Sequence, residues 1–172
     1  PCPPDRILAI TFTNKAAGEI KERLERVIGP AARDIWAGTF HSICVRILRR
    51  FGELVGYRSG FTIYDTDDKK RLISDVMKEL NISDKILQIK TVANAISAAK
   101  DKLISPDDYR PNPHNPRDKD IHRIYTAYQK ALMSYNAMDF DDIIMKTVEI
   151  LEGFEEPREY YQSKFRYVCV DE

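Results

Sequence analysis

A short polar turn near the N-terminus combines side chains that could hold the phosphate backbone of a nucleic acid. It contains Thr11, Phe12, Thr13, Asn14 and Lys15. Hydroxyls, an amide and a cation would surround the free N–H groups of a helix start, which attract phosphate. The alternative is an ordinary capped helix, with Thr13 or Asn14 as the N-cap and Phe12 in the core. Phe12 favours the first interpretation, because an aromatic ring among polar groups at a sheet edge can stack an unpaired base.

A second turn of the same kind follows the next predicted strand. Gly38, Thr39, Phe40 and His41 again set one aromatic ring among polar side chains. Taken alone, His41 is more typical of a capped loop histidine than of a ligand contact. Two such turns on neighbouring strand–helix units are stronger evidence than one. The sequence therefore predicts a contact surface that both turns share.

Two adjacent acids, Asp171 and Glu172, follow the apolar run Phe165–Val170. We predict that this run is a buried strand, which would put both acids at the sheet edge where α/β proteins place their chemistry. In a nucleoside triphosphatase the first acid holds Mg²⁺, usually through water, and the second polarises the attacking water. A solvated turn would look the same. The phosphate-binding pattern GxxxxGK[ST] does not occur in this sequence, so no nucleotide-binding residue is assigned within it.

Alternating strand and helix patterns position these residues. Ile7–Ile10 is a short apolar run, typical of a buried parallel strand, and the helix after it ends at Gly29. Ile35–Ala37 predicts a second strand, and the helix after that one reaches Phe51. Strands and helices that alternate with short connections predict a parallel α/β sheet.

A mainly helical block separates these elements from the last strand. Asp65 is a suitable N-cap for its first helix, and Tyr125, Tyr128 and Tyr135 fall on the buried stripe of a longer one. The acids of residues 139–142 resemble a metal cluster, but helix capping explains them and is the interpretation we prefer. The sequence predicts three segments: residues 1–60 in the α/β core, 61–137 in the helical insert and 138–172 in a return to the core.

Composition limits the remaining possibilities. The 172 residues include 27 basic and 27 acidic side chains, so any nucleic-acid binding must use a local groove rather than a generally basic surface. Short basic runs such as Lys69–Arg71 are typical of solvated helix faces. Three widely spaced cysteines argue against zinc or a disulfide framework and fit a reducing compartment. The sequence has no apolar run of membrane-spanning length, and it begins without Met, as a piece of a longer protein would.

Four motifs together resemble the superfamily 1 DNA helicases of the UvrD/PcrA/Rep group. They are ILAITFTNKAA at Ile7–Ala17, GTFHSICVRILRR at Gly38–Arg50, MDFDDII at Met138–Ile144 and FRYVCVDE at Phe165–Glu172. In that order they are similar to motifs Ia, Ib, Id and the start of motif II. The resemblance covers essentially the whole chain, including the insert, which resembles the 1B subdomain of the family.

The resemblance implies part of a RecA-like, P-loop NTPase core that lacks its phosphate-loop unit. The parent protein would be an ATP-dependent, Mg²⁺-dependent motor that moves 3′ to 5′ on single-stranded DNA, acts at single-strand/duplex junctions and serves DNA repair in the cytoplasm. Residues Thr11–Lys15 and Thr39–His41 would line the single-strand path. Asp171 would bind Mg²⁺ and Glu172 would activate water. Without the phosphate-binding loop, the chain alone is expected not to hydrolyse ATP.

Two alternatives stay open at this point. A helicase-nuclease of the RecB or AddA type shares the same motifs, and flanking sequence would separate it from the UvrD-like helicases. A non-catalytic module that binds DNA or a protein through the helical insert belongs to a different class. Such a module would have no Gly-Lys-Thr upstream in its gene.

Overall fold

A computed structural model describes residues 2–171 and divides the chain into two compact units. Unit 1 consists of Pro1–Val55 and Lys146–Glu172, and unit 2 is Gly56–Met145. The sequence placed the two boundaries at residues 60 and 138. In the structure, the first part of unit 1 ends at residue 55 and the second part begins at residue 146.

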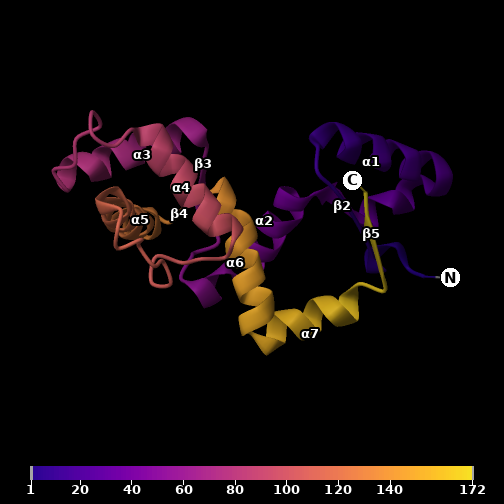
Figure 1. Ribbon diagram of the computed structural model, residues 1–172. Helices are drawn as coiled ribbons and strands as arrows, with labels where there is room; N and C mark the ends of the chain where they lie inside the picture. Colours follow the sequence, from indigo (N-terminus) through magenta and orange to yellow (C-terminus); the bar gives the residue numbers. More distant parts are fainter. Residues whose placement is uncertain (1, 172) are drawn as a thin grey trace. The chain divides into compact units, whose positions relative to one another are not determined.

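Unit 1 is built on a three-stranded parallel sheet in the order β2-β1-β5. The strands are β1 (Ile7–Thr11), β2 (Trp36–Thr39) and β5 (Tyr167–Val170). In register, Ile10 is paired with Gly38 on one side and with Val170 on the other. The three strands therefore run in one direction and end at one edge of the sheet (Figure 1). The predicted parallel α/β sheet is confirmed.

Helices follow the first two strands after very short turns. The helices of unit 1 are α1 (Asn14–Ile28), α2 (Phe40–Phe51) and α7 (Glu155–Lys164), with 3-10 turns at Pro4–Arg6, Gly29–Asp34 and Gly52–Val55. Helix α6 (Phe140–Gly153) runs across the boundary between the units. Gly29 ends α1 with a φ of 65°, a conformation that glycine adopts without the steric cost of a side chain.

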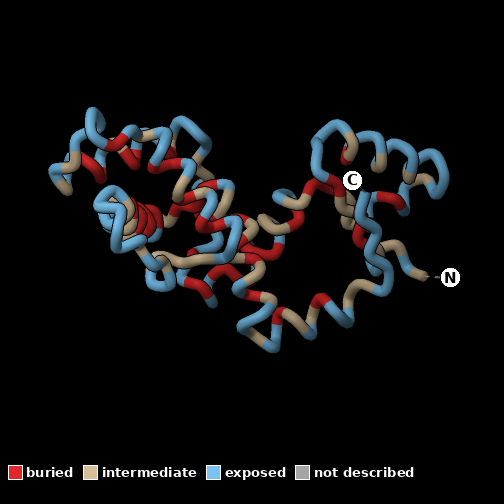
Figure 2. The backbone as a smooth tube through the Cα atoms, viewed as in Figure 1, coloured by how far each residue is buried: buried red, intermediate tan, exposed pale blue. Residues whose placement is uncertain are grey.

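The last strand corrects a prediction. We expected a buried strand, but β5 is exposed along its whole length, and Tyr167, Val168 and Val170 are 57–59% exposed. The physical reason is its place at the outer edge of the sheet, where only β1 pairs with it. Val27, near the end of α1, is also exposed, with 80% of its surface accessible to solvent. Figure 2 colours the exposed residues of both segments pale blue.

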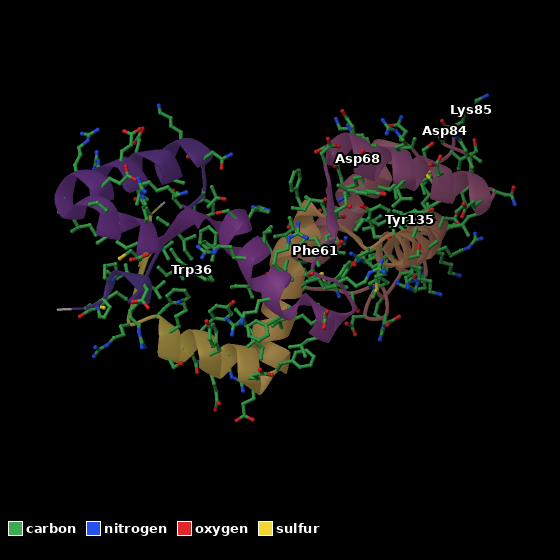
Figure 3. All side chains as sticks on the ribbon, turned by 180° about the vertical axis from the view of Figure 1, so that it is seen from behind. Trp36, Phe61, Asp68, Asp84, Lys85 and Tyr135 are labelled. Carbon is green, nitrogen blue, oxygen red and sulfur yellow. The ribbon has the colours of Figure 1, made fainter. Side chains whose placement is uncertain are left out.

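Trp36 anchors an aromatic cluster at the other end of β2. Its ring packs edge-on against Phe165, with centroids 5.2 Å apart, and against Tyr161 of α7 at 5.9 Å. The guanidinium of Arg46 lies 3.7 Å above the same ring. Figure 3 shows Trp36 beside α7. Arg50 lies over Tyr160 and donates a hydrogen bond of 2.8 Å to its hydroxyl, so these basic residues of α2 bind aromatic side chains of their own unit.

Unit 2 packs three helices around a continuous core. They are α3 (Thr66–Glu79), α4 (Ile89–Asp101) and α5 (Pro116–Ser134). Ile73, Ile96, Ile124 and Leu132 are fully buried between them, and Figure 2 shows the corresponding backbone in red. The connection between α3 and α4 carries Asp84 and Lys85 out into solvent (Figure 3).

A small sheet in unit 2 was missed by the sequence analysis. Strands β3 (Thr62–Tyr64) and β4 (Ala137–Asp139) pair in parallel, although 75 positions separate Thr62 from its partner Ala137. Segments of three residues are too short to show a strand periodicity, so only the tertiary pairing reveals them. Of the tyrosines expected in the core, Tyr125 and Tyr128 are fully buried, whereas Tyr135 is 61% exposed at the end of α5. Among residues 2–171, we find no helix that is both long and apolar enough to cross a membrane.

Candidate nucleic-acid interface

The parallel register of unit 1 brings most of the predicted site residues to one sheet edge. Thr11 at the end of β1 is paired with Thr39 at the end of β2. On the other side, the backbone N–H of Asp171 donates a hydrogen bond of 2.9 Å to the carbonyl of Ile10. The two polar turns and the acid after β5 therefore share the carboxyl edge of the sheet, which is where parallel α/β sheets bind ligands.

Threonine side chains start both helices at this edge. The hydroxyl oxygen of Thr13 accepts a hydrogen bond of 3.1 Å from the N–H of Ala16, and that of Thr39 accepts one of 3.2 Å from Ser42. These bonds satisfy N–H groups that have no partner within the helix. Of the two N-caps considered for α1, the structure has Thr13. A Cβ at Gly38 would collide with the hydroxyl of Ser42, so a larger residue there would displace this hydroxyl from its hydrogen bond to the Thr39 carbonyl.

Two predicted contact residues do not reach the surface. Thr11 is only 2% exposed and Thr39 only 9%. The side chain of Thr11 is buried at the end of its strand, and the hydroxyl of Thr39 is used as a cap. Neither position fits a direct contact with a nucleic acid. Their part in the structure is to fix the two turns that carry the exposed side chains.

Phe12 lies in the open, which excludes its alternative place in the core. Its side chain is 66% exposed, although Phe is among the residues most often buried. The ring contacts Phe40 from the second turn, with centroids 4.9 Å apart and planes tilted by 42°. Two turns that lie far apart in the sequence thus form one aromatic pair. Phe40 is half-buried, so Phe12 is the ring of the pair that is exposed to solvent and on which a base can stack.

Polar and charged side chains surround this pair. Asn14 and Lys15, in the first turn of α1, are exposed, and neither has a hydrogen-bond or ion-pair partner among residues 2–171. His41 is also exposed, at the corresponding place in α2. The surface at this edge therefore offers an amide, a cation and an imidazole next to two rings, without carboxylates on the same turns.

Asp171 is exposed directly after β5. A carboxylate in this position can hold Mg²⁺ through water, since oxygen ligands suit that ion. Glu172 lies outside the described residues, and its predicted role stays a prediction. Asp171 therefore fits a magnesium ligand, whereas the backbone cradle and lysine that hold phosphates are lacking in the sequence.

Unit 2 contains a lysine and two aspartates that are buried and paired with one another. Lys100 is fully buried on α4, with its Nζ 2.8 Å from Asp139 and 2.9 Å from Asp142. Asp139 accepts a hydrogen bond of 2.8 Å from the N–H of Asp142, while Asp142 accepts one of 3.2 Å from the N–H of Asp139. This reciprocal pair caps the start of α6, so the predicted capping is confirmed for Asp139 and Asp142, whereas Asp141 is paired with Lys69.

The buried charges shift one another's pKa values. Burial works against the charge of Lys100, but Asp142 and Asp139 outweigh it and raise the lysine pKa. Burial likewise opposes the ionised form of Asp139, yet Lys100 and Lys69 lower its pKa below the usual range. The pKa of Asp142 is raised by burial, which Lys100 only partly offsets, and by the neighbouring Asp139. Burial and the neighbouring Asp139 raise the pKa of Tyr128, whose hydroxyl donates a hydrogen bond of 2.8 Å to that carboxylate.

A cleft of about 310 Å³ opens beside this network in unit 2. Phe140, 47% exposed, lines it together with side chains of α3 and α4. The sequence assigned no role to Phe140, which lies inside the motif at Met138–Ile144. An aromatic residue directly after a capping aspartate, at the same place as Phe40 after Thr39, is the signal that could have identified it.

Fold and site together define a parallel α/β protein with exposed aromatic, amide and cationic groups at the carboxyl edge of its sheet. The family of the UvrD/REP helicase N-terminal domain matches residues 2–172. ATP-dependent DNA helicase PcrA from Bacillus subtilis (strain 168) is 44% identical over 169 residues, and PcrA from Staphylococcus epidermidis is 45% identical over 169 residues. Each alignment covers 98% of this chain and 23% of the relative.

The chain therefore belongs to the UvrD/REP helicase family. It spans 23% of the length of the PcrA helicases that it matches. The resemblance stated from the four motifs is confirmed at the level of the UvrD/PcrA family.

Proposed function

We propose that the chain forms part of an ATP-dependent DNA helicase that moves 3′ to 5′ on single-stranded DNA. In this proposal unit 1 belongs to a RecA-like motor domain, and unit 2 is the helical subdomain inserted into it. The carboxyl edge of the unit 1 sheet contacts the strand. Support comes from the family membership and from the names of the PcrA relatives, which are ATP-dependent DNA helicases.

The Phe12–Phe40 pair carries the proposal. A ring that is 66% exposed contributes little to the core, so its position needs another explanation. It lies among Asn14, Lys15 and His41, which can donate hydrogen bonds to phosphate oxygens or pair with their charge. Stacking on an aromatic side chain is tolerant of sequence, as a motor that moves along any strand requires. Phe140 offers a further exposed ring in unit 2.

The nucleotide side of the mechanism is assigned to two acids. Asp171 would hold Mg²⁺ through water, and Glu172 would orient the water that attacks the γ-phosphate of ATP. Bound Mg²⁺ would supply charge neutralisation at the phosphates. The pattern GxxxxGK[ST], whose backbone and lysine hold the β- and γ-phosphates, does not occur in this sequence. We therefore expect no ATP hydrolysis by the 172-residue chain alone.

Removal of the Phe12 ring tests the DNA contact. Phe12→Ala should weaken binding of a fluorescent oligo(dT) by about 1–3 kcal/mol, the usual cost of one lost stacking contact. Its melting temperature should stay close to that of the parent chain, since an exposed side chain contributes little to stability. Fluorescence anisotropy and thermal unfolding of the same preparation measure the two effects.

Two further variants make this test specific. Val27→Ala removes another exposed apolar side chain, on the same unit but at the far end of α1, and should leave DNA binding unchanged. Lys15→Ala should reduce the slope of log affinity against log salt by about the value for one phosphate contact. Phe12→Ala should leave this slope unchanged, because it removes no phosphate contact. A Phe12→Ala chain that binds as tightly as the parent would contradict the proposed base contact.

A further inference from the structure

Unit 2 contains one buried side-chain oxygen that has no hydrogen-bond partner among residues 2–171. It is Oε1 of Gln129, a buried residue of α5. The nitrogen of the same amide donates hydrogen bonds of 3.1 Å to Asp142 and 3.4 Å to the hydroxyl of Tyr57. A buried acceptor without a donor costs free energy, so this oxygen needs an explanation in the charged cluster beside it.

That cluster has more acids than bases. Its members are Lys69, Lys100, Asp139, Asp141 and Asp142, with nitrogen–oxygen distances of 2.8–3.7 Å within the ion pairs. With all five groups ionised, the cluster carries one net negative charge. Burial makes an unbalanced charge costly, so the uptake of one proton by one of the carboxylates would relieve it.

Asp139 and Asp141 are the better compensated acids. Asp141 accepts a hydrogen bond of 2.8 Å from Lys69, and its side chain is 25% exposed, so water solvates it as well. Asp139 accepts hydrogen bonds of 2.8 Å from Lys100 and from the hydroxyl of Tyr128. The ammonium group of Lys69 also lies 3.7 Å from Asp139. Each of these carboxylates therefore has contacts that favour its ionised form.

Asp142 is the least compensated acid. Its Oδ1 lies 2.9 Å from Nζ of Lys100, a cation that it shares with Asp139, and its side chain is only 1% exposed. Burial raises the pKa of Asp142, Lys100 only partly offsets this effect, and Asp139 raises the pKa further. Because the two acids interact, the first proton belongs to the pair, and these contacts place it on Asp142.

A proton on Asp142 needs a hydrogen-bond acceptor, and Gln129 can supply one. The amide nitrogen suits the ionised carboxylate, which only accepts, whereas the O–H of a protonated carboxyl would meet a second donor there. A half-turn of the amide exchanges nitrogen and oxygen and brings Oε1 next to Asp142. The nitrogen then takes the position without a partner, so this turn is favourable only when the proton is bound.

We propose that Asp142 and Gln129 form a proton-linked switch in unit 2, in which proton uptake by the carboxylate is coupled to a half-turn of the amide. The proton comes from solvent, one O–H bond forms, and no other covalent bond changes. Oδ2 of Asp142 continues to accept the hydrogen bond from the N–H of Asp139, so the cap of α6 is kept while the cluster loses its excess charge. The switch lets unit 2 keep its fold as the pH falls, and it does not depend on DNA or nucleotide binding.

Other titratable groups surround Asp142. They are Lys69 on α3, Lys100 on α4, Tyr125 and Tyr128 on α5, Asp139 on β4, Asp141 on α6, and Tyr57. Burial raises the pKa of Tyr125 and of Tyr128, and the neighbouring acids raise both further. Asp142 and Asp139 outweigh burial and raise the pKa of Lys100. These three groups therefore keep their protons at neutral and acidic pH, where the carboxylates titrate.

Nuclear magnetic resonance of the full 172-residue chain tests the coupling. The carboxyl carbon shift of Asp142 and the side-chain amide shifts of Gln129 are followed from about pH 4 to pH 8. Both should change with one common midpoint, because the same proton moves both, and this midpoint should lie above that of Asp139. The exposed glutamines Gln88 and Gln162 are controls in the same spectrum, and their amide shifts should not follow this midpoint.

Two variants make the test specific. Asp142→Asn imitates the protonated carboxyl, since its amide group can donate to Oε1 of Gln129 but cannot bind the proton. The Gln129 amide shifts in this variant should equal the acid limit of the parent chain at every pH. Gln129→Met identifies the two amide signals by removing them.

The outcomes decide each part of the proposal. Gln129 shifts that titrate in Asp142→Asn as they do in the parent would place the proton elsewhere and overturn the switch. Gln129 shifts that stay constant while Asp142 titrates would overturn the turn of the amide. If Asp142→Asn does not fold, the parent chain still decides, because a lower midpoint for Asp142 than for Asp139 would contradict the assignment. DNA binding enters none of these readouts, so a failure here is distinct from a failure of the proposed function.

Discussion

A charged cluster of unit 2 and the charged residues at the sheet edge of unit 1 lie in contrasting environments. In unit 2, Lys100, Asp139 and Asp142 are buried against one another and hold the start of α6 in place. In unit 1, Lys15 and Asp171 are exposed at the carboxyl edge of the sheet. Charges that pair inside a protein determine its structure, whereas unpaired charges at an edge remain available for a ligand.

Apolar residues show the same contrast. The core of unit 2 is closed, and Ile73, Ile96 and Ile124 have no exposed surface. In unit 1 the strand β5 exposes more than half of Val168 and of Val170. A buried side chain contributes its full transfer free energy, and an exposed one contributes little, so the stability of the two units should respond very differently to the same substitution.

The largest effect is expected from breaking the buried charge network. Lys100→Met would remove the cation that Asp139 and Asp142 share and leave Asp142 buried without a cation, which typically costs about 3–5 kcal/mol of unfolding free energy. Urea unfolding measures it, with Lys15→Met as the control, since an exposed position should change stability by at most about 0.5 kcal/mol. Equal effects of the two variants would show that the network of unit 2 does not stabilise the fold.

A smaller but clear difference is expected from apolar truncations. Ile124→Ala in unit 2 removes fully buried atoms and should cost about 2–5 kcal/mol. Val168→Ala in β5 should change the free energy of unfolding by no more than about 0.5 kcal/mol, because the valine is 58% exposed. A Val168→Ala variant as unstable as Ile124→Ala would mean that β5 is covered in solution, and would remove the contrast between the units.

The smallest effect concerns acid stability. Since the folded pKa of Asp139 is lowered, its stabilising contribution is present above the unfolded value of about 4 and is lost as the pH falls through the folded pKa. Asp142 has a raised pKa and opposes this dependence. Stability should therefore fall more steeply with acid in Asp142→Asn than in Asp139→Asn. Urea unfolding between about pH 3 and pH 6 measures the slopes, and a steeper Asp139→Asn slope would reverse the assignment.

Local sequence rules predicted much of the fold. Apolar runs and short turns identified β1 and β2, and Asp65 is the N-cap of α3 as predicted. These features depend on residues close together in the chain, so a single sequence contains enough information for them. The strands β3 and β4 do not depend on close neighbours in the chain, because each pairs with the other across 75 positions.

For the candidate site, the sequence determined which residues could do the chemistry, and the tertiary structure decided which of them are available. Thr11 and Phe12 are neighbours with the same predicted role, yet one is 2% and the other 66% exposed. Thr11 is the last residue of β1 and Phe12 lies in the turn after it, and only the packing of the folded chain decides which of the two side chains is covered.

The same division holds for the charges. A run such as Lys69–Lys70 is uniform in sequence, but the fold pairs Lys69 with Asp141, 72 positions away, and leaves Lys70 open to the cleft. The sequence by itself determined the strands β1 and β2, the capped helix starts and the motifs of the family, because short-range patterns specify them. The exposed aromatic pair, the buried lysine and the free cations were decided by the tertiary structure, because each depends on side chains that only folding brings together.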